Sequence, residues 1–566
     1  MIEEIKQEIK AKLITYYKEK YDVLLNVVVE EPKKAEMGDI SVPMFVMVKT
    51  LKKPMPEVVS EGVLAIESFG LPLESVNPTG PFINIFVDKK KVSNRVLNEV
   101  YTEKENYGLS HIGDGKNVTL DYSSPNIAKS FSIGHLRSTM IGNSLKLILN
   151  KCGYNTYAIN YLGDWGTQFG KMIVAYKNWG DLETIKADPI KELNKLYVRF
   201  HKEAEVDPSL EDKAREAFRQ MELNNPEYLD LWKWIREESL KESQQIYDLL
   251  DVTFDSYNGE AFYNDKMDSI VDELEQKNLL KEDQGAKIVD LGDDMPPALI
   301  KRSDGGSLYI TRDLAAVFYR KKEYKFDDVL YVVGNEQKLH FEQLKRLVTK
   351  MGYDFSDNIH HVGFGLYLTN GKKASTRKGN VVLLYDVLTD AINLAMQQVE
   401  AKNPNIKNKE EIAKNVGLAA VVFADLKNYR GLDIEFNIEN AVKFEGQTGP
   451  YLQYTGVRIA SILKDKEFDP SNLNDELFLK THYFELVKLV SEFKTAIEGA
   501  AKEYAPSIVA KYLLNLASSF NKFYSLEKIN VEDEKTRNTN FLLAYSVRTV
   551  LNEGLRLLGI KYLEEM

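Results

Sequence analysis

A strand, a proline-containing loop and a helix follow one another between residues 118 and 150, and this run constrains the fold more than any other. Residues 118–122 alternate and favour β structure, which predicts a short strand. Pro125 excludes an early helix, so residues 123–133 are expected to form a loop. From His135 onward apolar residues recur at helical spacing, and Gly153 lies where a C-cap would end the helix. This order is typical of the first crossover in a nucleotide-binding α/β unit.

The start of this helix is suited to binding phosphate. Its unpaired N–H groups form an electropositive corner. Gly134 carries no Cβ, so a flat ring or a phosphate can approach the backbone closely. His135 lies in the first turn, where its imidazole N–H could reach an anionic oxygen. Taken alone, however, the triplet Ile-Gly-His is more often a helix that merely begins with glycine and has a histidine nearby.

The wider string carries a family resemblance. It reads Asp121-Tyr-Ser-Ser-Pro-Asn126-Ile-Ala-Lys129 and, after Ser-Phe-Ser132, continues Ile-Gly-His-Leu-Arg-Ser-Thr. It resembles the nucleotide-binding signature of class I aminoacyl-tRNA synthetases, in the form found in arginyl-tRNA synthetases. That signature usually reads His-x-Gly-His, whereas here Ser132 occupies the place of the first histidine.

Composition describes a large globular protein. At 566 residues the chain is expected to hold roughly three to four domains. The single cysteine, Cys152, excludes an internal disulfide and a cysteine-based zinc site, and the seven histidines show no metal-ligand spacing, so no protein-bound metal is expected. No signal peptide is recognisable and no apolar run reaches the ~18 residues that a membrane span needs. We therefore expect a cytoplasmic protein without a membrane partner.

The net charge of −11 argues against nonspecific binding of nucleic acid. The negative charge is concentrated in the middle of the chain, and the two ends are close to neutral. This distribution permits a specific nucleic-acid partner without demonstrating one.

The secondary-structure pattern predicts a multidomain α/β fold. Residues 1–112 are expected to form an N-terminal α+β domain, with an amphipathic opening helix and a strand at residues 23–29. Residues 113–440 are expected to form a Rossmann-type domain with a parallel sheet and a mainly structural helical insertion at about 171–290. The family resemblance implies that this is the catalytic domain and that it includes a segment that contacts the tRNA stem. Residues 441–566 are expected to form an all-α helical bundle.

Three further segments extend the resemblance along the chain. Gly80-Pro-Phe82-Ile-Asn84 resembles the part of the family's N-terminal domain that grips the outer corner of the tRNA. The resemblance implies that Phe82 stacks near a base and that Asn84 reads that base's edge, as single-stranded recognition requires. Phe82 is equally well explained as a core residue.

A segment rich in cations, residues 371–380, resembles the family's Lys-Met-Ser-Lys-Ser loop. Ala374 replaces the methionine and Thr376 the second lysine. Four cations between two glycines suit the stabilisation of departing pyrophosphate, although a solvated turn is the simpler explanation. The resemblance implies catalytic roles for Lys373, Ser375, Arg377 and Lys378, with Lys129 replacing the missing lysine.

The C-terminal segment at residues 444–459 resembles the entry to the family's anticodon-binding bundle. The resemblance implies that Gln453, Tyr454 and Arg458 contact tRNA. Most aromatic residues of this region are nonetheless expected in the core.

The substrate pocket also follows from the resemblance. A guanidinium group calls for carboxylate partners. The family positions that hold it correspond to Asp121 and Asp313, with the ring of Tyr309 beside them in a predicted strand at residues 307–310. Asn126 and Gln337 correspond to positions near the substrate's α-amino group, and Ser132, Gly134, His135 and Lys129 to ATP-binding positions.

The implied activity is arginine–tRNA ligation. ATP, as its complex with Mg²⁺, and L-arginine would give arginyl-adenylate, and the arginyl group would pass to the terminal ribose of tRNA(Arg). We expect a monomer. Three alternatives remain open: a class I synthetase for another amino acid, a small nucleotidylyltransferase, and a catalytically impaired tRNA-binding relative, which the substitution at Ser132 would suit.

Overall fold

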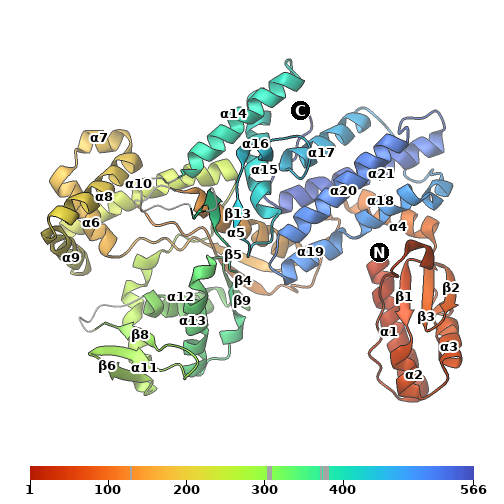
Figure 1. Ribbon diagram of the computed structural model, residues 1–566, viewed down its shortest axis with the longest axis horizontal. Helices are drawn as coiled ribbons and strands as arrows, with labels where there is room; N and C mark the ends of the chain where they lie inside the picture. The colour runs from red at the N-terminus through yellow and green to blue at the C-terminus, as the bar shows by residue number, and fades with distance from the viewer. Residues whose placement is uncertain (128–130, 303–308, 370–371, 374–381) are drawn as a thin grey trace.

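The computed structural model describes residues 1–127, 131–302, 309–369, 372–373 and 382–566. A small N-terminal domain, a central sheet with its helical insertion and a large helical half are distinct in the chain (Figure 1). The predicted fold class is confirmed, since a parallel sheet, an N-terminal α+β unit and a C-terminal bundle are all present.

The N-terminal domain packs three helices on an antiparallel sheet. The sheet order is β1 (Ile40–Pro43), β3 (Phe82–Val87) and β2 (Leu73–Thr79). The helices are α1 (Ile2–Tyr21), α2 (Phe45–Leu51) and α3 (Met55–Glu67). The strand predicted at residues 23–29 is wrong: these residues bury Leu25 and Val27 but form no ladder, and only Glu30 makes a bridge, to Ser41.

A four-stranded parallel sheet forms the centre of the catalytic domain. Its order is β10 (Ile359–His361), β9 (Asp328–Tyr331), β4 (Asn117–Asp121) and β5 (Asn155–Ile159). Helix α5 (Ile133–Lys151) makes the crossover from β4 to β5, as the sequence predicts, and Gly153 follows it at a φ of 85°. Because β4 lies between two parallel neighbours, its carboxyl end opens where ligands bind in such sheets.

The insertion predicted at about 171–290 is helical over most of its length, but its end forms strands, at Leu280–Asp283 and Ala286–Val289. It comprises α6 (Thr167–Trp179), α7 (Leu182–Ala187), α8 (Pro189–Val206), α9 (Ser209–Glu222) and α10 (Pro226–Leu250). These helices share a core of their own and project away from the parallel sheet (Figure 1).

A second lobe follows the insertion and returns the chain to the sheet. It contains η3 (Glu260–Lys266), α11 (Met267–Gln276) and an antiparallel sheet of β6 (Leu280–Asp283), β7 (Ala286–Val289) and β8 (Ala298–Lys301). Helices α12 (Tyr309–Tyr324) and α13 (Lys338–Lys350) flank β9 in sequence. The strand predicted at 307–310 is wrong where the structure describes it, because Tyr309 and Ile310 already belong to α12.

Helices dominate the rest of the chain. The main ones are α14 (Leu384–Lys402), α15 (Lys409–Leu426), α17 (Gly449–Leu463), α18 (Thr481–Ser491), α19 (Phe493–Lys502), α20 (Ser507–Leu526) and α21 (Glu534–Leu557). A small sheet joins β11 (Tyr367–Thr369) to β12 (Lys372–Lys373) and β13 (Ile434–Glu435). Within the described residues, no helix is long and apolar enough to cross a membrane.

The N-terminal domain is tied to the helical half by α4 (Lys89–Glu103) and the turn after it. Lys90 pairs with Glu476, and the hydroxyl of Tyr107 donates to the carbonyl of Val490 at 3.2 Å. Residues from the two ends of the chain therefore lie side by side (Figure 1).

Candidate active site

The first turn of α5 holds His135 in one tautomer. The backbone N–H of Ser132 donates to His135 Nδ1 at 3.0 Å, and Ser132 Oγ lies 3.1 Å from the same nitrogen. Because Nδ1 accepts this bond, the neutral imidazole carries its proton on Nε2. Among the residues that the structure describes, a Cβ added at Gly134 would meet only Ser132 Oγ, at 3.6 Å, so their packing does not require this glycine. The open backbone at this corner fits the approach of a ligand.

The first signature contacts the residues that follow the cationic segment. Ser132 and Leu383 form an antiparallel bridge, Ile133 N–H donates to the Val382 carbonyl at 3.1 Å, and Leu384 N–H donates to that of Phe131 at 2.9 Å. The other end of the segment begins at β12, which pairs with β11. The described residues that follow the cationic segment, 382–384, thus lie next to the first signature, although the two are far apart in the sequence.

Several predicted catalytic residues lie outside the described part of the chain. These are Lys129, Ser375, Arg377 and Lys378, while for Lys373 only the backbone, in β12, is described. Their assigned roles stay predictions.

Asp313 belongs to α12, and its carboxylate contacts a side chain of α13. Its Oδ2 is 2.6 Å from His340 Nε2. Tyr309, one turn earlier, is 62% exposed and lines a cavity of about 570 Å³ together with Trp165 and Arg312. The predicted aromatic and carboxylate neighbours of the substrate therefore lie on one helix beside an open cavity.

Glu260 is a second carboxylate close to Asp313 and Arg312, and the sequence did not point to it. Burial raises the pKa of Glu260 to about 7, and the charges of Asp313 and Asp164 add to this effect against the opposing influence of Arg312. Glu260 belongs to no motif, and only its place in space next to Asp313 reveals it. A carboxylate with such a raised pKa lacks full compensation and is suited to receive a cation.

Asp164 holds the segment that presents Glu260. Its Oδ1 accepts from the Ala261 N–H and its Oδ2 from Arg236 Nε, both at 2.8 Å. A Cβ at Gly259 would come within 2.6 Å of the Asp164 carboxylate, so this close approach requires glycine. Asp164 thus fixes the backbone directly next to Glu260.

Asp121 already has a guanidinium partner inside the protein. Arg320, which is fully buried, places Nη1 2.7 Å from Asp121 Oδ2, and Ser124 Oγ donates to Asp121 Oδ1 at 2.9 Å. The rings of Tyr161 and Tyr331 lie 5.2 and 5.5 Å from the Arg320 guanidinium. Asp121 is only 3% exposed and a substrate would have to displace Arg320, so the structure corrects the predicted direct contact.

Asn126 and Gln337 lie at the rim. Both side chains are exposed, Asn126 in a bridge with Gly163 and Gln337 at the end of η4 (Asn335–Gln337), directly before the helix of His340. A Cβ at Gly163 would come within 2.2 Å of Asn126 Oδ1, so this glycine makes room for the amide. Both positions are compatible with the predicted role near an α-amino group.

Of the two tRNA contacts predicted for the N-terminal domain, the structure changes one, that of Asn84. Phe82 packs edge-on against Phe45, with ring centroids 5.6 Å apart, and Phe45 is 51% exposed. Asn84 is buried, and its Oδ1 accepts from Ser41 Oγ at 3.0 Å. The Asn84 amide is committed to the core and cannot read a base, whereas Phe45 and Phe82 form an accessible aromatic pair.

Of the tRNA contacts predicted for the C-terminal bundle, the structure changes that of Gln453. Gln453 is buried, and its amide donates to the Lys561 carbonyl at 2.7 Å, so it fastens the C-terminal tail and does not face solvent. Tyr454 and Arg458 are half-buried, with the guanidinium 5.1 Å from the Tyr454 ring and 5.3 Å from that of Tyr524. Lys402 Nζ lies 4.4 Å from the Tyr454 ring, which makes this a cluster of aromatic rings and cations.

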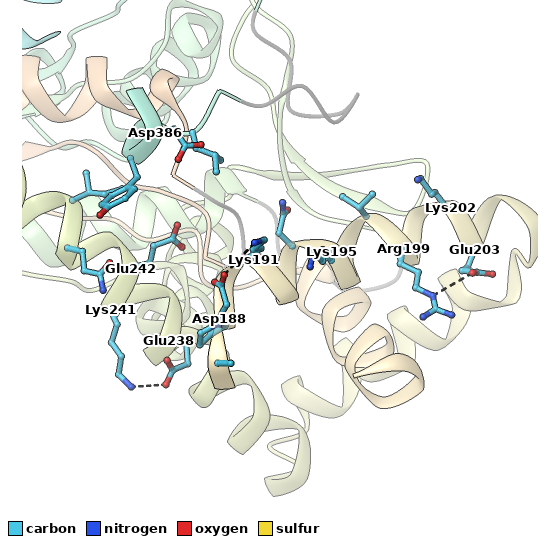
Figure 2. A pocket seen from close by; sticks show the side chains of 18 residues that line it. Asp188, Lys191, Lys195, Arg199, Lys202, Glu203, Glu238, Lys241, Glu242 and Asp386 are labelled. Carbon is cyan, nitrogen blue, oxygen red and sulfur yellow. Dashed lines mark hydrogen bonds and ion pairs between the residues drawn. The ribbon is translucent and has the colours of Figure 1, made fainter. Parts of the chain in front are cut away.

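A further cavity, of about 1190 Å³, lies between α8, α10 and the start of α14 (Figure 2). Its charged lining is balanced: Lys191, Lys195, Arg199, Lys202 and Lys241 face Asp188, Glu203, Glu238, Glu242 and Asp386. Four of these cations are already paired: Lys241 with Glu238 at 2.7 Å, Arg199 with Glu203 at 3.7 Å, Lys195 with Glu192 at 2.6 Å and Lys191 with Asp188 at 4.0 Å. With no net charge and no shared chemistry with the Asp313 pocket, this cavity is assigned no ligand.

Comparison with known proteins agrees with this arrangement. Three family models match consecutive parts of the chain: the arginyl tRNA synthetase N-terminal domain at residues 3–87, the catalytic domain of class I (R) tRNA synthetases at 96–438, and the DALR anticodon binding domain at 452–566.

Close relatives extend over nearly the whole length. The chain is 52% identical over 549 residues to the arginine–tRNA ligase of Ligilactobacillus salivarius, covering 96% of each, and 51% identical over 538 residues to that of Enterococcus faecalis, covering 95% of each. In fold it is similar to the arginyl-tRNA synthetase of Thermus thermophilus, with a TM-score of 0.82 at 24% identity over 99% of this chain and 100% of that one. The sheet, the signature helix and the three matched models together show that this chain belongs to the class I arginyl-tRNA synthetase family.

Proposed function

We propose that this chain activates L-arginine with ATP and transfers the arginyl group to the 3′-terminal ribose of tRNA(Arg). The observation that carries the proposal is that two carboxylates, Asp313 and Glu260, lie close enough to interact electrostatically with each other and with Tyr309 and Arg312, which line the cavity of about 570 Å³. Arginine–tRNA ligase is the activity of relatives that match 96% of the chain.

The pocket suits a guanidinium better than an ammonium group. A guanidinium is planar and can donate to two carboxylates at once, whereas a lysine ammonium is a compact point charge. Asp313 is oriented by His340 and Glu260 is anchored by the segment that Asp164 holds. The Tyr309 ring, at the start of α12, closes one side. Asn126 and Gln337 at the rim would receive the α-amino group.

Adenylate formation needs positioning and charge stabilisation, without a covalent enzyme intermediate. The arginine carboxylate attacks the α-phosphorus in line, the bond to the bridging oxygen breaks, and pyrophosphate leaves with the electron pair. His135 Nε2–H donates to a phosphate oxygen at the start of α5, beside Gly134. Mg²⁺ enters bound to ATP as part of the substrate. Lys129, Lys373, Ser375, Arg377 and Lys378 would offset the charge of the triphosphate.

tRNA would be held at both ends of the chain. The aromatic pair Phe45–Phe82 would stack on a base at the outer corner of the tRNA, and the cluster of Tyr454, Arg458 and Lys402 would face the anticodon. In this scheme residues 1–112 and 441–566 bind tRNA, and residues 113–440 carry out the chemistry. We further propose that the protein acts as a monomer in the cytoplasm.

Pyrophosphate exchange, measured with each amino acid in the presence and absence of tRNA, tests this function. We expect exchange with arginine and not with lysine, followed by arginylation of tRNA(Arg). Exchange with a different amino acid would instead identify another class I specificity, and tRNA binding without any exchange would identify a catalytically impaired relative. Light scattering of the free protein tests the monomer.

A further inference from the structure

Arg137 lies two residues after His135 in α5, yet it points into the protein and is only 1% exposed. We infer that Arg137 is a positioning residue for adenylate formation: one buried guanidinium fixes the start of the signature helix relative to β11 and α15. The inference rests on the proposed arginine activation and assigns to Arg137 no contact with substrate.

The guanidinium of Arg137 joins three separate segments. Its Nη1 donates to the carbonyls of Gly365 and Leu432, each at 2.8 Å, and its Nη2 donates to the carbonyl of Arg430 at 3.2 Å. A Cβ at Gly365 would come within 2.4 Å of the Leu432 oxygen, so the two backbone segments that contain Gly365 and Leu432 approach each other closely. Arg137 therefore fastens the residues before β11 to those before β13.

Asp425, at the end of α15, completes the arrangement. Its Oδ1 accepts from Arg137 Nε at 3.1 Å and its Oδ2 from the Tyr367 hydroxyl at 2.9 Å. Asp425 is 1% exposed and Tyr367 5%, so this ion pair has no access to water. A buried pair of this kind adds little net stability when complete, but removal of one partner leaves an uncompensated charge. The pair therefore contributes a fixed geometry between α5, β11 and α15 more than it contributes net stability.

The segments that Arg137 connects border the candidate active site. Tyr367 is the first residue of β11, and β11 leads along the chain to the cationic segment. At the other side, α5 presents His135 from the turn before Arg137. A rotation of α5 about Arg137 would change the distance between the two phosphate-binding stretches. Misplacement of reacting groups by about 1 Å can cost roughly a hundredfold in rate.

The same helix supplies a matched control. At its far end Lys151 forms an equally buried ion pair with Glu553 of α21, at 3.0 Å, with both side chains no more than 7% exposed. This second pair also ties α5 to the helical half, but it lies far along the helix from His135. It should share any effect on stability and none on catalysis.

The test compares Arg137→Lys with Lys151→Met in the full-length protein, in arginine-dependent pyrophosphate exchange at saturating tRNA. Rates are normalised to folded protein from thermal unfolding monitored by circular dichroism. We expect both variants to unfold at lower temperature. Arg137→Lys should lower kcat roughly 10- to 100-fold with the arginine KM unchanged, because the Asp313 pocket is untouched. Lys151→Met should keep the wild-type kcat.

Tyr367→Phe removes a single hydroxyl, and it tests the positioning role of Arg137 if Arg137→Lys does not fold. We expect a several-fold loss of kcat, and a combined Tyr367→Phe, Lys151→Met variant should show the loss of Tyr367→Phe alone. A wild-type kcat in Tyr367→Phe, or an equal loss in Lys151→Met, would overturn the inference. If the unmutated protein shows no exchange with arginine, the proposed function fails first, which separates the two failures.

Discussion

His340 Nε2 lies 2.6 Å from Asp313 Oδ2, so a histidine of α13 orients a carboxylate of α12 before any substrate is present. The two helices flank β9, and the contact therefore joins the guanidinium pocket to the rim that carries Gln337. A pocket oriented in advance loses less free energy on binding than one that must be ordered by its ligand.

Asp313→Asn should lose arginine activation by several orders of magnitude while the fold and ATP binding persist. An amide cannot supply the anion that a desolvated guanidinium needs, and loss of one partner from a buried charged pair costs ~3–5 kcal/mol. The measurement is kcat/KM for arginine in pyrophosphate exchange, with ATP affinity from calorimetry. His340→Gln, which keeps the anion, is the control and should lose roughly tenfold. Unchanged kinetics in Asp313→Asn would remove Asp313 from the pocket.

Arginine binding should weaken as the pH falls through about 7. Burial raises the pKa of Glu260 to about 7, with Asp313 and Asp164 adding to the rise and Arg312 opposing it. A protonated Glu260 cannot pair with a guanidinium, so the arginine KM should be flat at high pH and rise about tenfold per unit below the pKa. Glu260→Gln should raise KM at every pH and abolish this dependence. A pH-dependent KM that persists in Glu260→Gln would assign the titration to another group.

The raised pKa of Glu260 changes folding stability with pH in the direction opposite to its effect on arginine binding. Because the native state binds the Glu260 proton more tightly than the unfolded state does, the stability from this group is complete below its unfolded pKa and is lost as the pH rises through about 7. Arginine restores it by pairing with the anion. The rise in Tm on adding saturating arginine should therefore be larger at pH 8 than at pH 6, as measured by differential scanning fluorimetry, and an equal rise at both would contradict the assignment.

Lys129→Ala should abolish adenylate formation, whereas Ser132→Ala should be mild. Ser132 supports His135 mainly through its backbone N–H, which alanine keeps, and the loss of a neutral hydroxyl bond costs ~0.5–1.5 kcal/mol. A cation facing the triphosphate is worth more, and Lys129 is the candidate that replaces the lysine missing at Thr376. The double variant Lys129→Ala, Thr376→Lys should recover some activity. Near-normal exchange in Lys129→Ala would contradict the hypothesis that Lys129 replaces the lysine missing at Thr376. The activity of the unmutated protein would then have to be tested.

Local features of the fold could be predicted because they depend on neighbouring residues. The strand and the helix around Pro125 and His135 follow from alternation and helical spacing, and both are present; the described residues between them, 122–127 and 131–132, form no helix, as the fixed φ of proline predicts. The segment at residues 23–29 shows the limit of this reasoning. Its apolar residues do fill the core, but a strand also needs a partner, and pairing depends on parts of the chain far away.

Site residues could be predicted by position but not by orientation. Asp121 is at the expected strand end, but Arg320, two turns beyond Asp313 on α12, already pairs with it. Asn84 alternates in β3 so that its side chain enters the core, where Ser41 donates to it. Glu260 could not be found at all, since its raised pKa arises from burial beside groups distant in sequence.

Phe45→Ala combined with Phe82→Ala should weaken the use of tRNA and leave the residues of adenylate chemistry untouched. The rings form an edge-on pair with Phe45 on the surface, and stacking on a base is worth ~1–3 kcal/mol. A rise of roughly ten- to a hundredfold in tRNA KM is expected, measured by arginylation of tRNA(Arg), with exchange assayed at saturating tRNA so that activation is not limited by tRNA binding. Asn84→Ala is the control: it leaves Ser41 Oγ without its buried acceptor and should lower Tm without changing tRNA KM. A normal tRNA KM in a folded double variant would show that the aromatic pair only packs the N-terminal domain, and a raised KM in Asn84→Ala at unchanged Tm would restore the amide as a base reader.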